Sequence, residues 1–405
     1  MKFQNKNRLC FLAIAIIACS SSVLHAEDLT LEQLLLRIEQ LEALVKAKIE
    51  NDSPPKQSSK LLVEVTGDDA PVASSLVVFG AFRGSANNIS DQAETTGDSG
   101  FQDGLSFRNN SSVLGIRGET SQGDYKAYFK YLIRSHNDAV FDSGSLQSLY
   151  FYAGVASPFG SVQAGTQNSP YKAPALEIDP FYDTSSAIRS GLFNNGDSGP
   201  IKNGDSGFDG SNVGMSLLSM GFTRNIIAYK SPTFFGFDVD ASVMIDDTNA
   251  DKHDYNLGFT YKNGPFRGGL QHLFLEQSQA TAFSDGEGDA TRIWGAFEQT
   301  LWSVAASYEA VSVDVGEDQD HTFLTGSYHV NNRLKLAASW GQSDTPGLPD
   351  AYRDGNGYSL GAFFKALPNF QVWSIYHNLD RNNGLDRSLV SLGAEYKFAW
   401  KHMQH

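Results

Sequence analysis

Three copies of Gly-Asp-Ser-Gly contain residue types that could take part in nucleophilic catalysis. They occupy 97–100, 196–199 and 204–207, and an exposed Asp-Ser pair could offer a serine nucleophile to a histidine base. No histidine motif that would supply the base accompanies them, and each copy lies in a segment rich in Gly, Asn and Asp. This pattern is typical of polar loops, so we expect no serine hydrolase.

The other candidate chemical motifs are also incomplete. Ser169 and Lys172 fit a Ser-x-x-Lys pattern, but the partner motifs of the corresponding enzymes are missing. The nine histidines show neither metal-ligand spacing nor a pair one helical turn apart. The spacing of Asp197, Asp205 and Asp209 does not fit an EF-hand loop, although calcium binding by these acidic loops stays an open alternative. We therefore expect no enzyme, no cofactor and no metal site.

Basic residues recur at every fourth position in a segment that is otherwise apolar and aromatic. Lys126, Lys130 and Arg134 share one parity. The residues of the other parity are Tyr125, Ala127, Phe129, Tyr131 and Ile133. Successive side chains of a β-strand point to opposite faces, so the alternation predicts a strand with one polar and one apolar face. The same period returns around 235–243 and 334–340. A sheet with one water-facing side is therefore expected to position Lys126, Lys130 and Arg134.

The alternating segments divide into sixteen predicted strands. Their starts lie near 76, 107, 124, 146, 160, 222, 235, 253, 265, 291, 301, 320, 332, 356, 369 and 386. Every second connection is a tight turn, such as 121–123 or 263–265, and the others are longer and rich in Asp, Gly, Asn and Ser. A soluble β-sandwich has no reason to segregate short and long connections in this way. The pattern predicts an all-β fold, a 16-stranded antiparallel transmembrane β-barrel with both termini at the short-turn rim.

The first 26 residues have the features of a signal peptide. Three cations within the first eight residues precede the apolar run 9–18, and Ala26 ends a plausible cleavage site. The run is too short to span a bilayer as a helix, which takes about 20 residues. A lipobox-like run that would make Cys19 a lipidated residue stays an alternative. On either interpretation the protein leaves the cytoplasm.

Cysteine content and charge exclude several classes of function. Cys10 and Cys19, the two cysteines, both lie inside the signal, so the mature chain is expected to have no thiol chemistry and no disulfide. Cleavage removes Lys2, Lys6 and Arg8 and no acidic residue, which changes the formal net charge from -15 to -18. Nucleic acid demands a basic surface, so no nucleic-acid partner is expected.

A short heptad pattern follows the signal at 27–50. Its seam positions are Leu31, Leu34, Ile38, Leu41 and Val45. They predict a short periplasmic coiled-coil helix, which is marginal alone and is expected to need partner copies. An amphipathic helix packed on another surface is the alternative. Residues 51–75 are rich in Pro, Ser and Asp and are expected to form a flexible linker, which leaves 76–405 for the barrel.

Several stretches of the predicted barrel occur in an informative order. They are 113–119, 152–155, 159–170, 179–181, 224–237 and 261–265. In sequence they include Val-Leu-Gly-Ile-Arg-Gly-Glu, Asp-Pro-Phe and Ser-Pro-Thr-Phe-Phe-Gly-Phe. Each is modest alone, but over roughly 76 to 398 the ordered set resembles the Gram-negative general porins, a family of trimeric, sixteen-stranded outer-membrane barrels.

The resemblance implies that a long third loop, about 168–221, folds into the barrel and narrows it. The acidic residues of its early part, Glu177, Asp179 and Asp183, would then line the constriction. The cations of the facing wall would be Arg83, Arg117, Lys126, Lys130 and Arg134. Carboxylates opposite cations create a transverse field that orients dipolar solutes. The implied function is an outer-membrane porin, a water-filled channel for passive diffusion of small hydrophilic solutes and ions across the bacterial cell outer membrane.

The resemblance also implies a homotrimer in a lipid bilayer with lipopolysaccharide. Departures from the family pattern bear on the expected ion selectivity and on the length of the last strand. Family members often carry arginine where Val113 and Thr166 stand here, so in this acidic chain we expect a mild cation preference. The family usually stops at a terminal aromatic residue, whereas here 399–405 follow Phe398. Trp400 keeps the alternation, so the last strand is expected to run longer.

Two alternative functions stay open. A substrate-selective porin for phosphate would need a ladder of lumen arginines, but the 14 arginines of the chain are scattered. A porin for sugars would need a run of lumen aromatics, which the sequence does not establish. A structural tether would use the helix at 27–50 to hold peptidoglycan or another periplasmic partner, with the barrel as its anchor.

Overall fold

The structure, a computed structural model, describes twelve stretches of the chain. They are 73–91, 104–110, 112–135, 146–184, 214–216, 218, 223–245, 252–276, 287–314, 317–344, 355–381 and 386–404. All of them belong to the second of two compact units, which spans 69–405. Residues 1–72 lie outside the described part of the chain. They include the predicted signal peptide at 1–26, the predicted helix at 27–50 and all but the last three residues of the predicted linker at 51–75. The first strand begins at Ala73, three residues before the predicted start of the barrel.

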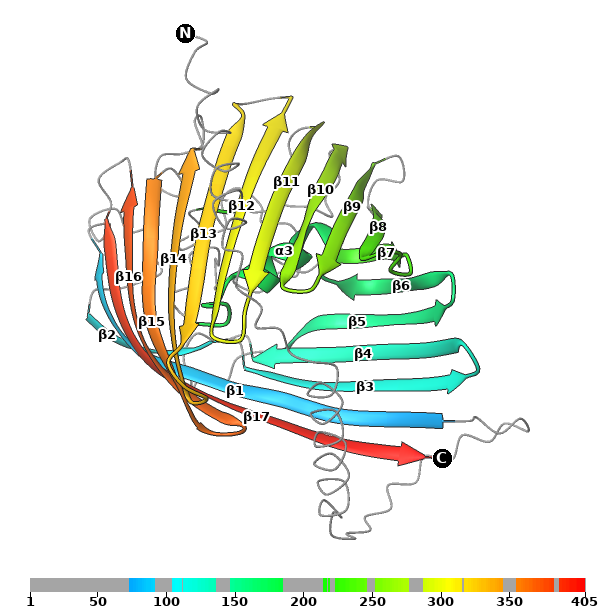
Figure 1. Cartoon of the computed structure of the whole chain (residues 1–405), viewed down its shortest axis with the longest axis horizontal. Helices are drawn as coiled ribbons and strands as arrows, with labels where there is room; N and C mark the ends of the chain where they lie inside the picture. The colour runs from blue at the N-terminus through cyan, green and yellow to red at the C-terminus, as the bar shows by residue number, and fades with distance from the viewer. Residues whose placement is uncertain are drawn as a thin grey trace, which may run out of the picture. The chain divides into compact units, whose positions relative to one another are not determined.

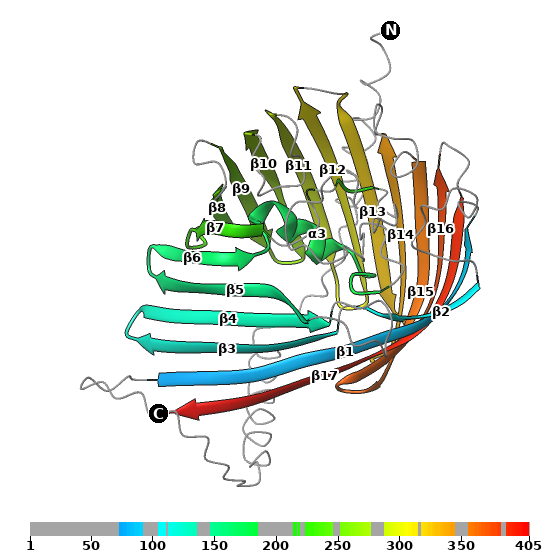
Figure 2. The same ribbon diagram turned by 180° about the vertical axis from the view of Figure 1, so that it is seen from behind.

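Antiparallel strands form one closed sheet (Figures 1 and 2). Their bounds are β1 Ala73–Asp91, β2 Gly104–Asn109, β3 Val113–Gln122, β4 Tyr125–Ser135, β5 Leu146–Ser157, β6 Gly160–Gln167, β7 Thr223–Lys230, β8 Phe237–Ile245, β9 His253–Asn263, β10 Phe266–Glu276, β11 Glu287–Glu298, β12 Trp302–Val313, β13 Gln319–His329, β14 Leu334–Asp344, β15 Gly355–Leu367, β16 Phe370–Arg381 and β17 Arg387–Gln404. Each strand pairs with its neighbours, and β1 closes the ring by pairing with β17 on one edge and with β2 and β3 on the other.

The segments β2 and β3 are one strand with an interruption. They pair end to end along β1, so the ring has sixteen strands, as predicted. Three residues separate Asn109 from Val113, whereas their partners on β1 are separated by two, which is the geometry of a β-bulge. The Arg83 backbone keeps its partners there: its N–H donates to Ser112 Oγ at 2.9 Å, and its carbonyl accepts from Asn110 N–H at 3.2 Å.

The predicted connections and strand starts are confirmed closely. Most strands begin within two residues of the predicted position, and the largest difference among the uninterrupted strands is at β11, which begins at Glu287 instead of 291. The short turns, such as 123–124 and 264–265, all join strand pairs at the rim where β1 begins and β17 ends. Gly123 and Gly264 have positive φ angles of 57° and 56°, which a glycine adopts without steric cost.

The two faces of the sheet differ in the way that alternation predicted. Apolar and aromatic side chains point away from the barrel axis and are exposed, with 62 % of Phe82, 67 % of Phe151 and 58 % of Leu392 accessible. Polar groups such as Asp254 and Ser391 point inward and are buried. An apolar exterior on a sheet without a free edge is stable in hydrocarbon, because every backbone polar group can be paired within the ring.

The last strand continues past the level where its neighbour begins. The β16 ladder with β17 starts at the pair of Phe370 with Tyr396, whereas the β1 ladder with β17 continues to the pair of Ser74 with Gln404. Trp400 stands opposite Val78 and stays on the outer face. The prediction of a longer final strand is therefore confirmed, and the residues after Phe398 extend the seam that closes the barrel.

The helical elements among the described residues are short and lie inside the ring. They are the 3-10 turn η2, Pro170–Lys172, and the helix α3, Ala173–Ile178 (Figure 2). Ser169 caps η2, because its hydroxyl accepts the Lys172 N–H at 3.3 Å. No helix among the described residues is long and apolar enough to cross a membrane.

Deletion of 399–405 tests the contribution of the extended seam. The deletion removes the partners of β1 from Ser74 to Phe79, so the barrel should unfold at a lower temperature while its channel stays intact. The measurement is the temperature at which the folded band on a denaturing gel converts to the unfolded band. Deletion of His405 alone is the control. Equal unfolding temperatures for both deletions would contradict a stabilising role of the extension.

Candidate pore constriction

The third loop, which joins β6 to β7 and is called L3 below, lies against the inner wall of the barrel. Its described residues are 168–184, 214–216 and 218. Ala175 and Ile178 of α3 pack with Trp294 and Phe323 of the wall. Further along, Phe181 is fully buried, and its ring centroid lies 5.7 Å from that of Phe363. This apolar side of L3 explains why the loop enters the lumen, and the predicted inward fold is confirmed.

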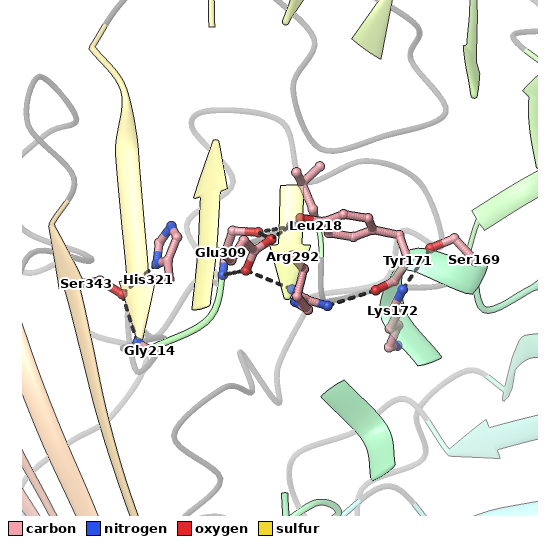
Figure 3. A network of polar contacts seen from close by, with 10 residues as sticks. Ser169, Tyr171, Lys172, Gly214, Leu218, Arg292, Glu309, His321 and Ser343 are labelled. Carbon is pink, nitrogen blue, oxygen red and sulfur yellow. Dashed lines mark hydrogen bonds and ion pairs between the residues drawn. The ribbon is translucent and has the colours of Figure 1, made fainter. Parts of the chain in front are cut away.

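A buried ion pair on the wall holds L3 at its first turn (Figure 3). Arg292 of β11 and Glu309 of β12 stand directly opposite each other, with their charged atoms 2.7 Å apart and side chains 0 % and 1 % exposed. The Tyr171 hydroxyl donates to Glu309 at 2.8 Å, and Arg292 donates to the Tyr171 carbonyl at 2.8 Å. The Arg292 guanidinium also lies 4.6 Å from the Tyr171 ring centroid. Burial raises the pKa of the Tyr171 hydroxyl well above its usual value, so the phenol stays protonated and donates.

The far end of L3 contacts the carboxylate of the same pair. Ser216 donates to Glu309 from both its backbone N–H, at 2.9 Å, and its hydroxyl. Gly214 N–H donates to Ser343 Oγ at 2.8 Å, and this hydroxyl also lies 2.7 Å from His321 Nδ1 (Figure 3). Arg292, Glu309, His321 and Ser343 are successive partners across β11 to β14, so one inward-facing row of the sheet anchors both ends of the loop.

The three predicted constriction carboxylates have different surroundings. Glu177 is exposed and forms a 3.2 Å ion pair with Arg267 of β10. Asp179 is buried, and its carboxylate accepts the Phe181 N–H at 2.9 Å, so it shapes the loop and does not face the passage. Asp183 forms a 3.1 Å ion pair with Arg83. Asp183 has a φ of 66°, a conformation that aspartate tolerates better than most residues.

The predicted wall cations divide into two groups. Arg83 does not face the loop across the lumen, because it contacts Asp183 directly and is also paired with Glu395 of β17. The other four share the inward face of β3 and β4: Arg117, Lys126, Lys130 and Arg134. Arg117 stands directly opposite Lys130, and Lys126 forms a 3.4 Å pair with Glu119. The structure thus brings together the cations of β3 and β4 and assigns Arg83 to the loop attachment.

Sequence reasoning missed the residues that fix the loop. They are Tyr171, Arg267, Arg292, Glu309 and Glu395. The pair of Arg292 with Glu309 had a signal, because both residues lie at equal distances from the tight turn between the strands and therefore stand opposite each other. No such signal exists for Tyr171 or Glu395, whose partners lie far away along the chain.

Candidate metal sites are absent from the described part of the chain. No group of three or more His, Cys, Asp or Glu side chains among these residues is arranged to hold an ion. The charged clusters of the described residues consist of ion pairs and hydrogen bonds between strands and loop. They can position a solute or an ion but offer no activated nucleophile.

A closed barrel of sixteen antiparallel strands, apolar outside and narrowed by a loop fastened inside, defines a transmembrane channel. The sequence model of the Gram-negative porin family matches residues 57–365. The chain is 24 % identical over 359 residues to the major outer membrane protein P.IB of Neisseria gonorrhoeae, with 84 % of this chain and 90 % of that protein covered. The chain therefore belongs to the Gram-negative porin family.

Solved structures show the same fold at low sequence identity. The anion-selective porin from Comamonas acidovorans matches 80 % of this chain and all of its own with a TM-score of 0.63 and 16 % identity. The trimer form of the outer membrane protein OmpT of Vibrio cholerae matches 80 % of this chain and 99 % of its own with a TM-score of 0.55 and 16 % identity. The protein is an outer-membrane channel and not an enzyme, and it resides in the bacterial outer membrane.

Substitution of the buried carboxylate tests the attachment of L3. Glu309→Gln leaves Arg292 buried without a counter-charge, which costs about 3–5 kcal/mol in comparable pairs, so the loop should detach more often from the wall. We expect more open-channel current noise and more brief closures in planar bilayers. Glu287→Gln is the control, because Glu287 pairs with Lys252 at 2.8 Å at an exposed position where such pairs contribute little. Equal noise in both variants would contradict the proposed attachment.

Proposed function

We propose that the chain forms a water-filled pore for passive diffusion of small hydrophilic solutes and ions, with the constriction at L3. The observation that carries this proposal is the attachment of L3 along one side of the lumen, from Tyr171 at the β11–β12 wall to Asp183 at the β1–β17 seam. A loop held at both places narrows the passage without blocking it. No chemical step is required of a pore whose task is to set a width and a field.

The field at the constriction would arise between the loop and the opposite wall. Glu177 and Asp183 bring negative charge to the loop side, whereas Arg117, Lys126 and Lys130 bring positive charge to the inner face of β3 and β4. Water molecules and dipolar solutes gain by aligning with such a field, and apolar solutes do not. This arrangement favours small polar solutes over apolar ones of the same size.

The pore would prefer cations mildly. The chain has a formal net charge of -15, and residues 113 and 166 are the neutral Val113 and Thr166. The basic wall of β3 and β4 opposes this preference locally, so the preference should be small. The opposite preference stands in the name of the similar Comamonas porin, which is anion-selective.

A homotrimer in the lipid bilayer, with lipopolysaccharide around it, completes the proposal. It is supported by the similarity to a porin that was solved in a trimer form and by the exposed aromatic and aliphatic outer face. The roles of the helix at 27–50 as a peptidoglycan or periplasmic contact, and of the barrel as a tether, concern residues outside the described part and stay predictions.

Planar-bilayer recording and vesicle permeability test the pore. Purified protein in detergent should insert as channels that close in three equal steps, and vesicles that contain it should admit small sugars. Vesicles that stay sealed to small sugars would contradict the pore function. Closure in single steps only would contradict the trimer and leave the pore in place.

The reversal potential in a salt gradient tests the sign of the selectivity. The wild type should favour potassium over chloride by a small factor, and the variant Lys126→Gln with Lys130→Gln should favour potassium more strongly, because two lumen cations are removed. Asp183→Asn should shift the potential in the opposite direction, and it retains a residue that tolerates a positive φ. A wild-type preference for chloride would contradict the proposed cation preference.

A further inference from the structure

Aromatic side chains gather around two of the lumen cations. Phe79, Tyr128, Tyr150 and Tyr152 come from β1, β4 and β5 and share the inward face with Arg117 and Lys130. We call these six residues the aromatic–cationic wall. The sequence alone did not establish a run of lumen aromatics, because their common face depends on the register between strands.

The cations of this wall contact rings instead of carboxylates. Lys130 Nζ lies 4.1 Å from the Tyr150 ring centroid and 5.8 Å from that of Phe79, and Arg117 Cζ lies 5.5 Å from the Phe79 centroid. Such contacts are cation–π interactions. Among the described residues, neither Arg117 nor Lys130 forms an ion pair.

Carboxylates of β3, β17 and L3 already have partners. Glu119 pairs with Lys126 at 3.4 Å, and Asp183 and Glu395 both pair with Arg83. Arg117 and Lys130 stand directly opposite each other on neighbouring strands, where like charges repel. An anion placed between them would remove this repulsion, and a planar carboxylate matches the two-pronged geometry of a guanidinium.

The tyrosines form a rigid aromatic surface next to the cations. The ring of Tyr152 meets those of Tyr128 and Tyr150 edge to face, with centroids 6.5 Å and 6.0 Å apart. Tyr128 donates to Gln163 at 3.1 Å, and Asn168 at the start of L3 donates to the Tyr150 hydroxyl at 2.6 Å. All three tyrosines are part-exposed, so a solute ring could pack on them without a rearrangement.

We propose that the aromatic–cationic wall is a binding site in the lumen for aromatic carboxylates. The carboxylate would accept from Arg117 and attract Lys130, and the solute ring would pack against Tyr128 and Tyr152. A neutral sugar would contact the rings but not the two cations that face each other, and an aliphatic anion would contact the cations but not the rings. The site rests on the proposed pore function, because it names a solute class that the same passage would retain in transit.

Current recording with benzoate as the probe tests the site. In planar bilayers with the full chain, benzoate should reduce the current at lower concentrations than acetate, which lacks the ring, or benzyl alcohol, which lacks the charge. Arg117→Gln should weaken the benzoate effect about tenfold, because a charge-assisted hydrogen bond is lost. Tyr152→Leu should weaken it severalfold through the lost ring contact.

Two controls keep the result specific. Lys262→Gln removes an exposed cation on β9, and Tyr125→Leu removes an exposed ring on the outer face of β4, and both should leave the benzoate effect unchanged. Normal conductance with equal effects of benzoate and acetate, or equal loss in Lys262→Gln and Arg117→Gln, would overturn the site and leave the pore intact. Absence of conductance in every salt would overturn both.

Discussion

A charge pair without access to water fixes the position of L3 inside the barrel. Arg292 and Glu309 are too deeply buried to be solvated, so each depends on the other and on the hydrogen bonds that L3 supplies. The loop in turn contributes the Tyr171 carbonyl as an acceptor for Arg292 and the Ser216 N–H as a donor to Glu309. Detachment of the loop would therefore remove the hydrogen bonds of Tyr171 and Ser216 to this pair at the same time.

Closure of the sheet is the constraint within which this attachment operates. Hydrocarbon cannot hydrogen-bond a free strand edge, so β1 must meet β17 along the ring, and the long ladder between them satisfies that need. Arg83 lies in this seam and joins it to L3 through Asp183, while Glu395 of β17 holds the same guanidinium. The loop therefore connects the β11–β12 wall to the seam through ion pairs and hydrogen bonds.

The two sides of the lumen have different chemical characters as a result. On the loop side, acidic groups form ion pairs with wall arginines or are folded into the loop, as with Glu177 and Asp179. On the β3–β4 side, Arg117 and Lys130 rest against aromatic rings, which offset their charge less completely than a carboxylate would. A solute that carries both a ring and an anionic group is the natural complement of that side, whereas small ions respond to the summed charge of the whole pore.

Alternation and turn chemistry in the sequence alone determined the sixteen strands, the outward and inward faces and the rim that carries the short turns, because these depend on neighbours in the chain. The parity of Lys126, Lys130 and Arg134 placed them correctly on one face for the same reason. The attachment of Arg83 to Asp183, the burial of Asp179 and the contact of Tyr171 with Glu309 were decided only in three dimensions. Their partners lie about 100 or more residues apart or depend on how L3 packs, and local pattern carries no information about which distant side chains a folded loop will meet.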